Sequence, residues 1–312
     1  MDFTTLLDPL GELRDCAICP RNCHADRFSG RLGYCMSDAT FNISSICIHN
    51  GEEPAISGTE GICNIFFTHC NLQCIYCQNF QISDNQVQFK STEIELAEVI
   101  RQVSLILDSG IKRVGFVSPS HFIPQVRIII DCLRAIGYSP VFIYNTNGYD
   151  RAETIRSLEG LIDVFLPDLK YLDPGLAASF SDAPDYPGIA KAALKEMYRQ
   201  KGAVLHTDEN GSAISGIIIR HLVLPDQVQN SIDVLNFIAE DLSPRIHISL
   251  MSQYYPTPAV SCHPSLKRTI AKAEYEKVTN ELHKLGMYNG WIQELTSEHH
   301  YRPDFKLDHP FE

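Results

Sequence analysis

Three cysteines, Cys70, Cys74 and Cys77, lie close together in the segment FFTHCNLQCIYCQN at residues 66–79. In a reducing compartment, clustered thiols usually bind a metal or a cofactor rather than form disulfides. A structural zinc ion normally takes four ligands, and no fourth cysteine is spaced to complete this set. Three thiolates on a [4Fe–4S] cluster leave one iron open to a non-protein ligand, which explains the number three. Zinc completed by His69, or three unligated thiols, are the alternatives.

Four further cysteines form a second group near the N-terminus, in the segment CAICPRNCHADRFSGRLGYC. They are Cys16, Cys19, Cys23 and Cys35. Four thiolates in a loop-rich segment are sufficient for a closed structural zinc site. The Cys19-Pro20 pair is also similar to iron–sulfur loops, so an auxiliary [4Fe–4S] cluster fits the same set. The sequence does not choose between the two metals, and unligated thiols are a third interpretation.

The composition narrows the class of protein. The chain has 312 residues, of which 44% are hydrophobic, with a formal net charge of −12 and a pI of about 5.4. The excess of acidic residues argues against general binding to nucleic-acid backbones. The first residues, MDFTTLLDPLGELRDC, contain neither the basic leader nor the apolar core of a signal peptide, and no apolar run has membrane-spanning length. We therefore expect a cytoplasmic protein without a membrane partner.

Short apolar segments alternate with longer amphipathic ones after residue 60, and this order predicts strands that alternate with helices. The expected strands lie at residues 62–67, 112–117, 140–145, 162–170, 214–224 and 245–252. Such repetition predicts a parallel sheet with right-handed crossovers. We expect an α/β fold in which residues 61–312 form a partial (β/α)6 barrel with a C-terminal helix and strand. Residues 1–60 are expected to form a cysteine-rich metal-binding extension.

A barrel of this kind gathers its chemistry where the strands end and the loops begin. The three clustered cysteines follow the first expected strand and therefore lie at that end. Asp168 and Lys170 are two residues apart on the fourth expected strand, so their side chains face the same way. A carboxylate and an ammonium inside a barrel are costly unless they are paired, which makes this pair a candidate functional site.

The cysteine spacing, in the context C-N-L-x-C-x-Y-C-x-N, resembles that of the radical S-adenosylmethionine (SAM) superfamily. Within it, the chain is most similar to the activating enzymes of glycyl-radical enzymes, and to a branch related to pyruvate formate-lyase activating enzyme. The similarity covers nearly the whole chain. The passages that carry it are HNGEEPAISGTEG, VSPSHFIPQ, YNTNGYD, LPDLKYLDP, APDYP, IRHLVLP and QYYPT.

This resemblance implies a radical SAM partial barrel and an oxidoreductase reaction. Cys70, Cys74 and Cys77 hold a [4Fe–4S] cluster, whose electron cleaves SAM to methionine and a 5′-deoxyadenosyl radical that abstracts hydrogen. It also implies an electron donor such as flavodoxin or ferredoxin. A protein partner activated at a glycyl residue is the first substrate class, and a small molecule, peptide or RNA is the alternative. A non-catalytic iron–sulfur or zinc protein is a further alternative, but such a protein needs no barrel.

The resemblance also assigns residues around SAM. Tyr76 matches an aromatic near the adenine, although shielding of the cluster explains it equally well. Asn145 and Asn147, on either side of Thr146, match a D-T-N-G segment whose polar groups hydrogen-bond SAM. Asn145 replaces the aspartate of that segment. An ordinary turn is the alternative for these residues.

Two charged sites follow from the same comparison. Asp168 and Lys170 match a D-L-K segment at the open end of the barrel. Arg220 matches an arginine near the SAM carboxylate, where a guanidinium is geometrically suited to binding, although a structural ion pair is the alternative.

The chain departs from the activating enzymes at two places that surround the substrate. The glycine-rich G-G-E-P segment after the second strand, which accepts the SAM amine, is replaced by VSPSHF. We expect Ser118, Ser120 or His121 to take its role. A GEEP sequence does occur at residues 51–54, but it precedes the cysteine strand and so is not in the usual place of that motif. The last barrel strand carries Ser252–Tyr255 in place of a histidine.

Overall fold

The protein is described by a computed structural model, which covers residues 4–86, 94–295, 302–307 and 310–311. In these residues nine strands form one sheet, in the order β1-β2-β3-β4-β5-β7-β8-β9, with β6 paired to β7. The strands are β1 (Ile43–His49), β2 (Ile62–Phe67), β3 (Arg113–Val117), β4 (Val141–Thr146), β5 (Val164–Pro167), β6 (His206–Thr207), β7 (Ala213–Leu222), β8 (His247–Met251) and β9 (Gly290–Ile292).

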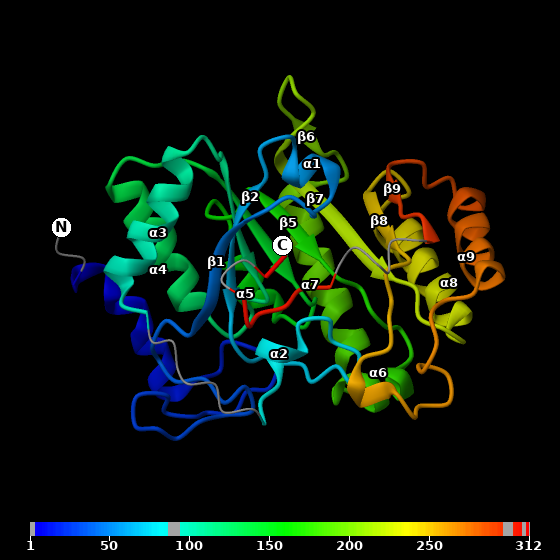
Figure 1. The fold of residues 1–312 in the computed structure, drawn as a ribbon, viewed down its shortest axis with the longest axis horizontal. Coiled ribbons are helices and arrows are strands. Elements are labelled where there is room, and N and C mark those ends of the chain that lie inside the picture. The colour runs from blue at the N-terminus through cyan, green and yellow to red at the C-terminus, as the bar shows by residue number, and fades with distance from the viewer. Residues whose placement is uncertain (1–3, 87–93, 296–301, 308–309, 312) are drawn as a thin grey trace.

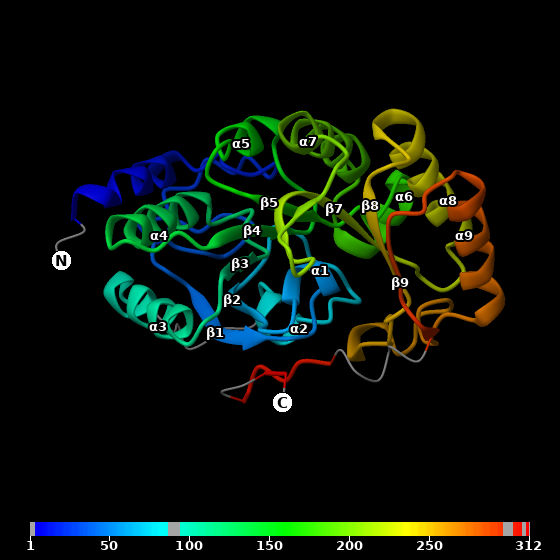
Figure 2. The same ribbon diagram turned by 90° about the horizontal axis from the view of Figure 1, so that it is seen from above.

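The path from β2 to β9 is parallel throughout, whereas β1 is antiparallel to β2 and β6 to β7. Seen from above in Figure 2, the strands form an arc with the helices outside, and the C-terminal segment lies at its open side. The sheet is therefore a partial barrel. The predicted α/β fold, all six expected strands and the additional C-terminal strand are confirmed.

Helices connect the parallel strands and cover the outer face of the arc (Figure 1). The longer helices are α3 (Leu96–Asp108), α4 (Ile123–Ala135), α5 (Ala152–Arg156), α6 (Pro174–Ser181), α7 (Tyr186–Lys201), α8 (Val228–Phe237) and α9 (Lys272–Lys284). Two single-turn helices, α1 (Pro54–Ser57) and α2 (Phe80–Ser83), lie at opposite ends of the strands. Within the described ranges, no helix combines the length and apolarity needed to cross a membrane.

The core lies between the sheet and these helices. Phe116, Phe142 and Phe165 from adjacent strands are buried there against the apolar face of the helices. Residues at alternate positions of a strand point to opposite faces, so the inner face of the arc carries the other side chains. Several of these are polar, including Asn145, Arg220 and Ser249. The sequence thus builds an apolar outer layer and a polar barrel interior.

One strand in the first 60 residues was not predicted. β1 pairs antiparallel with β2, and its pairing register shifts between Ile43 and Ser45. A bulge of this kind breaks the alternation of apolar and polar residues by which strands are predicted. The segment before β1 also packs on the barrel, since Arg151 Nη1 and Thr154 Oγ1 donate hydrogen bonds of 2.7 Å to the backbone carbonyls of Ala17 and Ile18.

Candidate active site

The loop after β2 carries the three clustered cysteines to the carboxyl end of the sheet. His69 has a positive φ of 61°, which turns the chain directly after the buried strand. Each cysteine sulfur then accepts a hydrogen bond. Asn147 Nδ2 donates to Cys70 Sγ at 3.3 Å, Ser181 Oγ to Cys74 Sγ at 3.0 Å, and Ser83 Oγ to Cys77 Sγ at 3.2 Å. Donors aimed at sulfur stabilise a thiolate, the form that binds metals.

Burial opposes ionisation of these thiols in the absence of a cation. It raises the pKa of Cys70 to about 12 and that of Cys74 to about 11, and it also raises the pKa of Cys77. The three sulfurs therefore need a positive group before all can act as thiolates. Lys170 supplies part of this charge, because its ammonium lowers the pKa of Cys74 and Cys77 against the effect of burial.

The three cysteine thiols do not surround a single-ion site within the described residues. Across the described part of the chain, no three His, Cys, Asp or Glu side chains converge on a point where one metal ion could bind. A single zinc ion requires such convergence, and His69 does not complete a zinc site with the cysteines in this arrangement. In a [4Fe–4S] cluster each thiolate binds a different iron, so the sulfurs are held apart.

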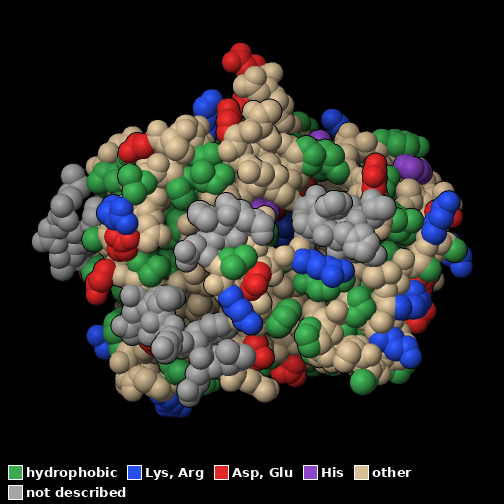
Figure 3. Space-filling model, in the orientation of Figure 1, with side chains coloured by type: hydrophobic (Ala, Val, Ile, Leu, Met, Phe, Trp, Pro, Cys, Tyr) green, Lys and Arg blue, Asp and Glu red, His purple; other side chains and the backbone are tan. Residues whose placement is uncertain are grey.

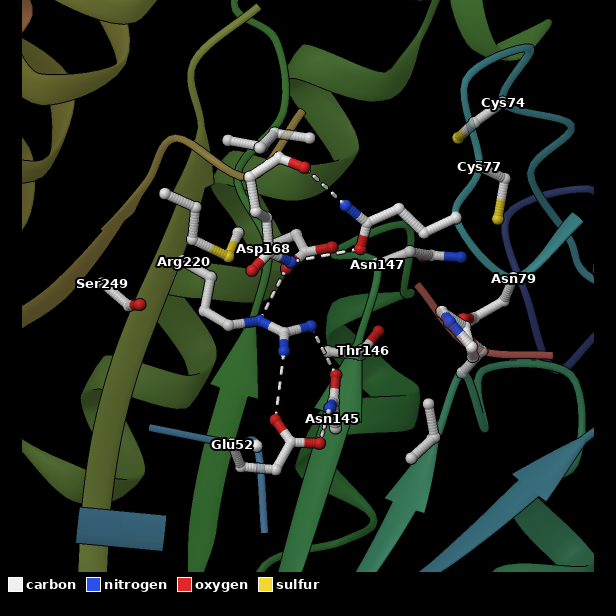
Figure 4. A pocket seen from close by; sticks show the side chains of 18 of the residues that line it. Glu52, Cys74, Cys77, Asn79, Asn145, Thr146, Asn147, Asp168, Arg220 and Ser249 are labelled. Atoms are coloured by element: carbon white, nitrogen blue, oxygen red, sulfur yellow. Dashed lines mark hydrogen bonds and ion pairs between the residues drawn. The ribbon is translucent and has the colours of Figure 1, made fainter. Parts of the chain in front are cut away.

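A charged network lies beside the cysteine loop (Figure 4). Lys170 Nζ donates to Asp168 Oδ2 at 2.6 Å, and Arg220 Nε donates to Asp168 Oδ1 at 2.8 Å. Burial raises the pKa of Asp168, but the positive charges of Arg220 and Lys170 lower it by more. The pKa of Asp168 is therefore below its ordinary value. The carboxylate is therefore ionised and shared by two cations. The structure brings together the three charged residues predicted from the sequence.

The chain leaves β5 in a way that creates this network. The Asp168 amide donates to the Thr146 carbonyl at 2.8 Å, whereas the Leu169 amide donates to the Arg220 carbonyl at 2.9 Å. β5 lies between β4 and β7, and the amides of Asp168 and Leu169 continue its bonding to these two neighbours. The regular strand ends at Pro167, earlier than the predicted end at residue 170, and an isolated parallel bridge then places Asp168 beside Arg220.

The polar residues predicted at the ends of β3 and β4 take different positions. Asn145 Oδ1 accepts a 2.6 Å hydrogen bond from Arg220 Nη2, and Asn147 Nδ2 contacts the cysteine loop. Both line the same cavity as Ser118 and Thr146. Ser118 has a positive φ of 53°, which turns the chain at the end of β3.

Three other predicted residues are held by neighbouring protein groups. Tyr76 lines the cavity, but it is buried and its hydroxyl is hydrogen-bonded to that of Tyr171. His121 does not line the cavity, which corrects its predicted position. Its Nε2 lies 3.0 Å from the Thr68 carbonyl, and burial lowers its pKa to about 3. The chain turns at Ser118, and the imidazole of His121 lies against the loop after β2 instead of in the barrel interior. The hydroxyl of Ser120 is also engaged, since its Oγ lies 3.0 Å from Thr146 Oγ1.

The cysteine loop, the charged network and the polar ends of β3 and β4 line a cavity of about 570 Å³ inside the barrel. The cysteine loop lines one end, and the network of Asp168, Lys170 and Arg220 lies between it and the other end. A hollow is visible near the centre of the face in Figure 3. The described Lys and Arg side chains on that face are interspersed with acidic ones and form no continuous basic stripe.

Sequence reasoning missed the acidic residues at the far end of the cavity. Glu52 Oε2 lies 3.5 Å from Arg220 Nη1, and Glu52 Oε1 accepts a 2.9 Å hydrogen bond from Asn64 Nδ2. The neighbouring Glu53 also lines the cavity. The signal for these residues is the GEEP sequence at 51–54, which precedes the cysteine strand and so lies outside the usual place of the G-G-E-P motif. The antiparallel pairing of β1 brings it to the barrel from the end opposite the cysteines.

The four N-terminal cysteines lie near one another in the segment before β1. Cys16, Cys19 and Cys35 are buried, and Cys23 is half-buried. Burial raises the pKa of Cys19 to about 12, with further contributions from the other three thiols. These four thiols, like the central three, do not converge on a single-ion site within the described residues.

The chain was compared with known proteins. A search against models of protein families finds no match. The uncharacterized protein MJ0674 of Methanocaldococcus jannaschii is 27% identical over 274 residues, which covers 85% of this chain and 73% of that protein. Streptococcus suis SuiB bound to S-adenosylmethionine aligns with a TM-score of 0.48 and 13% identity, over 73% of this chain.

A domain of pyruvate-formate lyase-activating enzyme from Bacteroides vulgatus aligns with a TM-score of 0.39 and 17% identity, over 55% of this chain and 93% of that domain. The chain spans 48% of the length of SuiB. Likenesses this distant do not assign an activity, so the function rests on the site itself.

Proposed function

We propose that this chain is a radical SAM enzyme. One observation carries the proposal. The three thiols of the Cys-x₃-Cys-x₂-Cys loop follow the first parallel strand and line the same cavity as a lysine, an arginine and the polar ends of β3 and β4. An electron-transfer or zinc protein needs no such cavity beside its metal. A radical SAM enzyme needs it to hold SAM against the cluster.

The cysteines would hold a [4Fe–4S] cluster with one open iron, and this group would supply the electron for the cleavage of SAM to methionine and a 5′-deoxyadenosyl radical. The protein has three tasks. First, hydrogen bonds to the cysteine sulfurs orient the thiolates and adjust the potential of the cluster; the donors are Asn147, Ser181 and Ser83. The barrel wall excludes water. The charged network orients SAM.

Lys170 is the better candidate to bind the carboxylate of SAM. Its ammonium has three donors, and a single described partner, Asp168, accepts from it. It also lies close enough to the cysteines to lower the pKa of Cys74 and Cys77. Arg220, by contrast, is engaged by Asp168, Asn145 and Glu52. We therefore assign Arg220 to positioning Asp168 rather than to direct contact with SAM.

The finer proposal concerns the hydrogen that is abstracted. The sequence resemblance supports a glycyl residue of a protein partner, with flavodoxin or ferredoxin as electron donor. The polar far end of the cavity supports a small molecule instead, because it lies inside the barrel and carries charged groups of its own. In both cases the 5′-deoxyadenosyl radical abstracts the hydrogen, and the two proposals differ only in the molecule that supplies it.

Reductive cleavage of SAM tests the proposal. The full chain would be reconstituted anaerobically with iron and sulfide, reduced with dithionite and given SAM, and 5′-deoxyadenosine and methionine would be quantified. Wild type and Cys262→Ala, which changes an exposed cysteine, should form both products. Cys74→Ala should form neither. A wild-type protein with a full complement of iron that leaves SAM intact would refute the proposal, as would product formation by Cys74→Ala.

A further inference from the structure

Two buried polar side chains at the far end of the cavity have atoms without a hydrogen-bond partner. Glu53 is 9% exposed and His49 is 8% exposed, and both line the cavity. Among the described residues, nothing bonds to Glu53 Oε2 or to His49 Nδ1. Leaving a buried polar group unsatisfied costs about 1–3 kcal/mol. Buried polar groups in native proteins are nearly always satisfied by protein, water or a ligand, so two unpartnered acceptors on one cavity wall mark a place where a ligand can bind.

Among the described ion pairs, none includes Glu53, although the two other largely buried carboxylates of the cavity are paired. Asp168 is paired with Lys170 and Arg220, and Glu52 with Arg220. When Glu53 is ionised, it forms with Asp168, Glu52, Lys170 and Arg220 a group of three carboxylates and two cations, with one negative charge in excess. The pKa of Glu53 is raised, and burial is the largest cause. The positive charge of Arg220 offsets only part of this effect. A ligand cation would remove the imbalance.

The other groups nearby suit a cation with several donors. Burial lowers the pKa of His49 to about 4, so its imidazole is neutral at pH 7 and its unpartnered Nδ1 can accept a hydrogen bond. Ser249 lies close enough to act as a hydrogen-bond donor to Glu53. The rings of Phe311 and Trp291 also line the cavity, and the Phe311 ring centroid lies 4.0 Å from that of His49. Aromatic faces attract ammonium and guanidinium groups.

We propose that Glu53, His49 and Ser249 form a recognition site for the ammonium or guanidinium group of a small organic cation, which is the substrate of the enzyme. Two acceptors and aromatic walls match a group that carries several N–H donors and a positive charge. The inference rests on the proposed function in assigning the cysteine end of the cavity to SAM.

The position of the site separates it from SAM. The charges of Lys170 and Asp168 shift the pKa values of Cys74 and Cys77. The charges of Arg220 and Glu52 instead shift the pKa of Glu53, and the charge of Glu53 shifts that of His49. Arg220 therefore lies between the two ends. Figure 4 shows the same order, with Cys74 and Cys77 on one side of Asp168 and with Arg220 between Asp168 and Glu52. A second ligand can occupy the far end while SAM lies against the thiols.

Binding of n-butylammonium to the reconstituted full chain tests this site, with n-butanol and butyrate as neutral and anionic probes of similar size. Dissociation constants would be measured by ligand-observed NMR, with and without SAM. We expect the cation to bind at least about tenfold more tightly than either other probe, and SAM not to displace it. Glu53→Gln should weaken cation binding by at least about tenfold. Glu294→Gln, which changes an exposed carboxylate at the edge of the same cavity, should not.

Equal binding of the three probes, or an unchanged affinity in folded Glu53→Gln, would overturn the proposal. Displacement of the cation by SAM would show that Glu53 serves SAM and would overturn the assignment to a second ligand. If Glu53→Gln does not fold, magnetisation transfer from the His49 ring protons to butylammonium in wild type decides instead, and its absence counts against the site. A chain that selects the cation yet never cleaves SAM refutes only the proposed function. A chain that cleaves SAM without this selectivity refutes only the present inference.

Discussion

Asp168→Asn should destabilise the protein strongly, because Asp168 neutralises two buried cations at once. Its carboxylate accepts from Lys170 at 2.6 Å and from Arg220 at 2.8 Å, and the three side chains are only 16–17% exposed. Removing one partner of a buried ion pair typically costs about 3–5 kcal/mol. Glu52 remains 3.5 Å from Arg220, so we expect the lower end, about 3 kcal/mol.

Urea unfolding at equal cluster loading measures this loss as a change in the free energy of unfolding. Asp241→Asn is the matched control, since Asp241 forms a 2.7 Å ion pair with Lys195 in which both side chains are about half exposed. The control should unfold like wild type. Adding Lys170→Met to Asp168→Asn should recover part of the loss, because it removes a cation left without a partner.

The pH dependence of the free energy of unfolding tests the same prediction in a second way. The folded pKa of Asp168 is lowered, so its stabilisation is present above the unfolded-chain value of about 3.9 and is lost as the pH falls below it. Wild type should therefore lose more stability than Asp168→Asn between pH 5 and pH 2. If Asp168→Asn is as stable as Asp241→Asn, or if the two acid profiles coincide, the account of the network is wrong.

Three further predictions follow from other parts of the chain. Burial lowers the pKa of His221 to about 4, so the stabilisation from the neutral imidazole is lost as the pH falls from about 6.5 to about 4. Between pH 7 and pH 4, His221→Gln should therefore lose up to about 3 kcal/mol less free energy of unfolding than wild type, as measured by urea unfolding. Gly148→Ala should destabilise by at least about 2 kcal/mol, since φ is +80° and a Cβ would lie 2.2 Å from the Asp168 carbonyl oxygen; Gly137→Ala, with φ +96° and open space, should cost less in the same assay. The N-terminal cysteines should hold a separate metal, either zinc or a [4Fe–4S] cluster, because they are a complete set of four thiols. Iron, sulfide and zinc analysis should detect it in a variant with alanine at Cys70, Cys74 and Cys77. Finding no metal there would contradict this prediction.

Local patterns were sufficient to predict the barrel. The strands around Phe116, Phe142 and Phe165 are short apolar runs separated by amphipathic helices, and both signals are contained within each segment. The convergence of Asp168, Lys170 and Arg220 was also predictable. Their strands are parallel neighbours, so residues near the strand ends meet at one edge of the sheet.

The remaining features depend on contacts between distant segments. Glu52 and Glu53 reach the barrel only because β1 pairs antiparallel with β2, and the bulge after Ile43 hides that strand from its pattern. His121 was placed in the cavity by its position after β3. The left-handed turn at Ser118 directs it elsewhere, and a left-handed non-glycine residue has no clear sequence signal.

We propose that Cys70, Cys74 and Cys77 hold a cluster with one iron open to SAM, and binding of SAM to that iron should alter the electronic state of the reduced cluster. This is tested by the electron paramagnetic resonance spectrum of the dithionite-reduced full chain, recorded with and without SAM. We predict that SAM changes the spectrum of wild type. We also predict that replacing these three cysteines with alanine abolishes the SAM-sensitive signal. A wild-type spectrum that SAM leaves unaltered, or a SAM-sensitive signal that survives in the triple variant, would contradict the account.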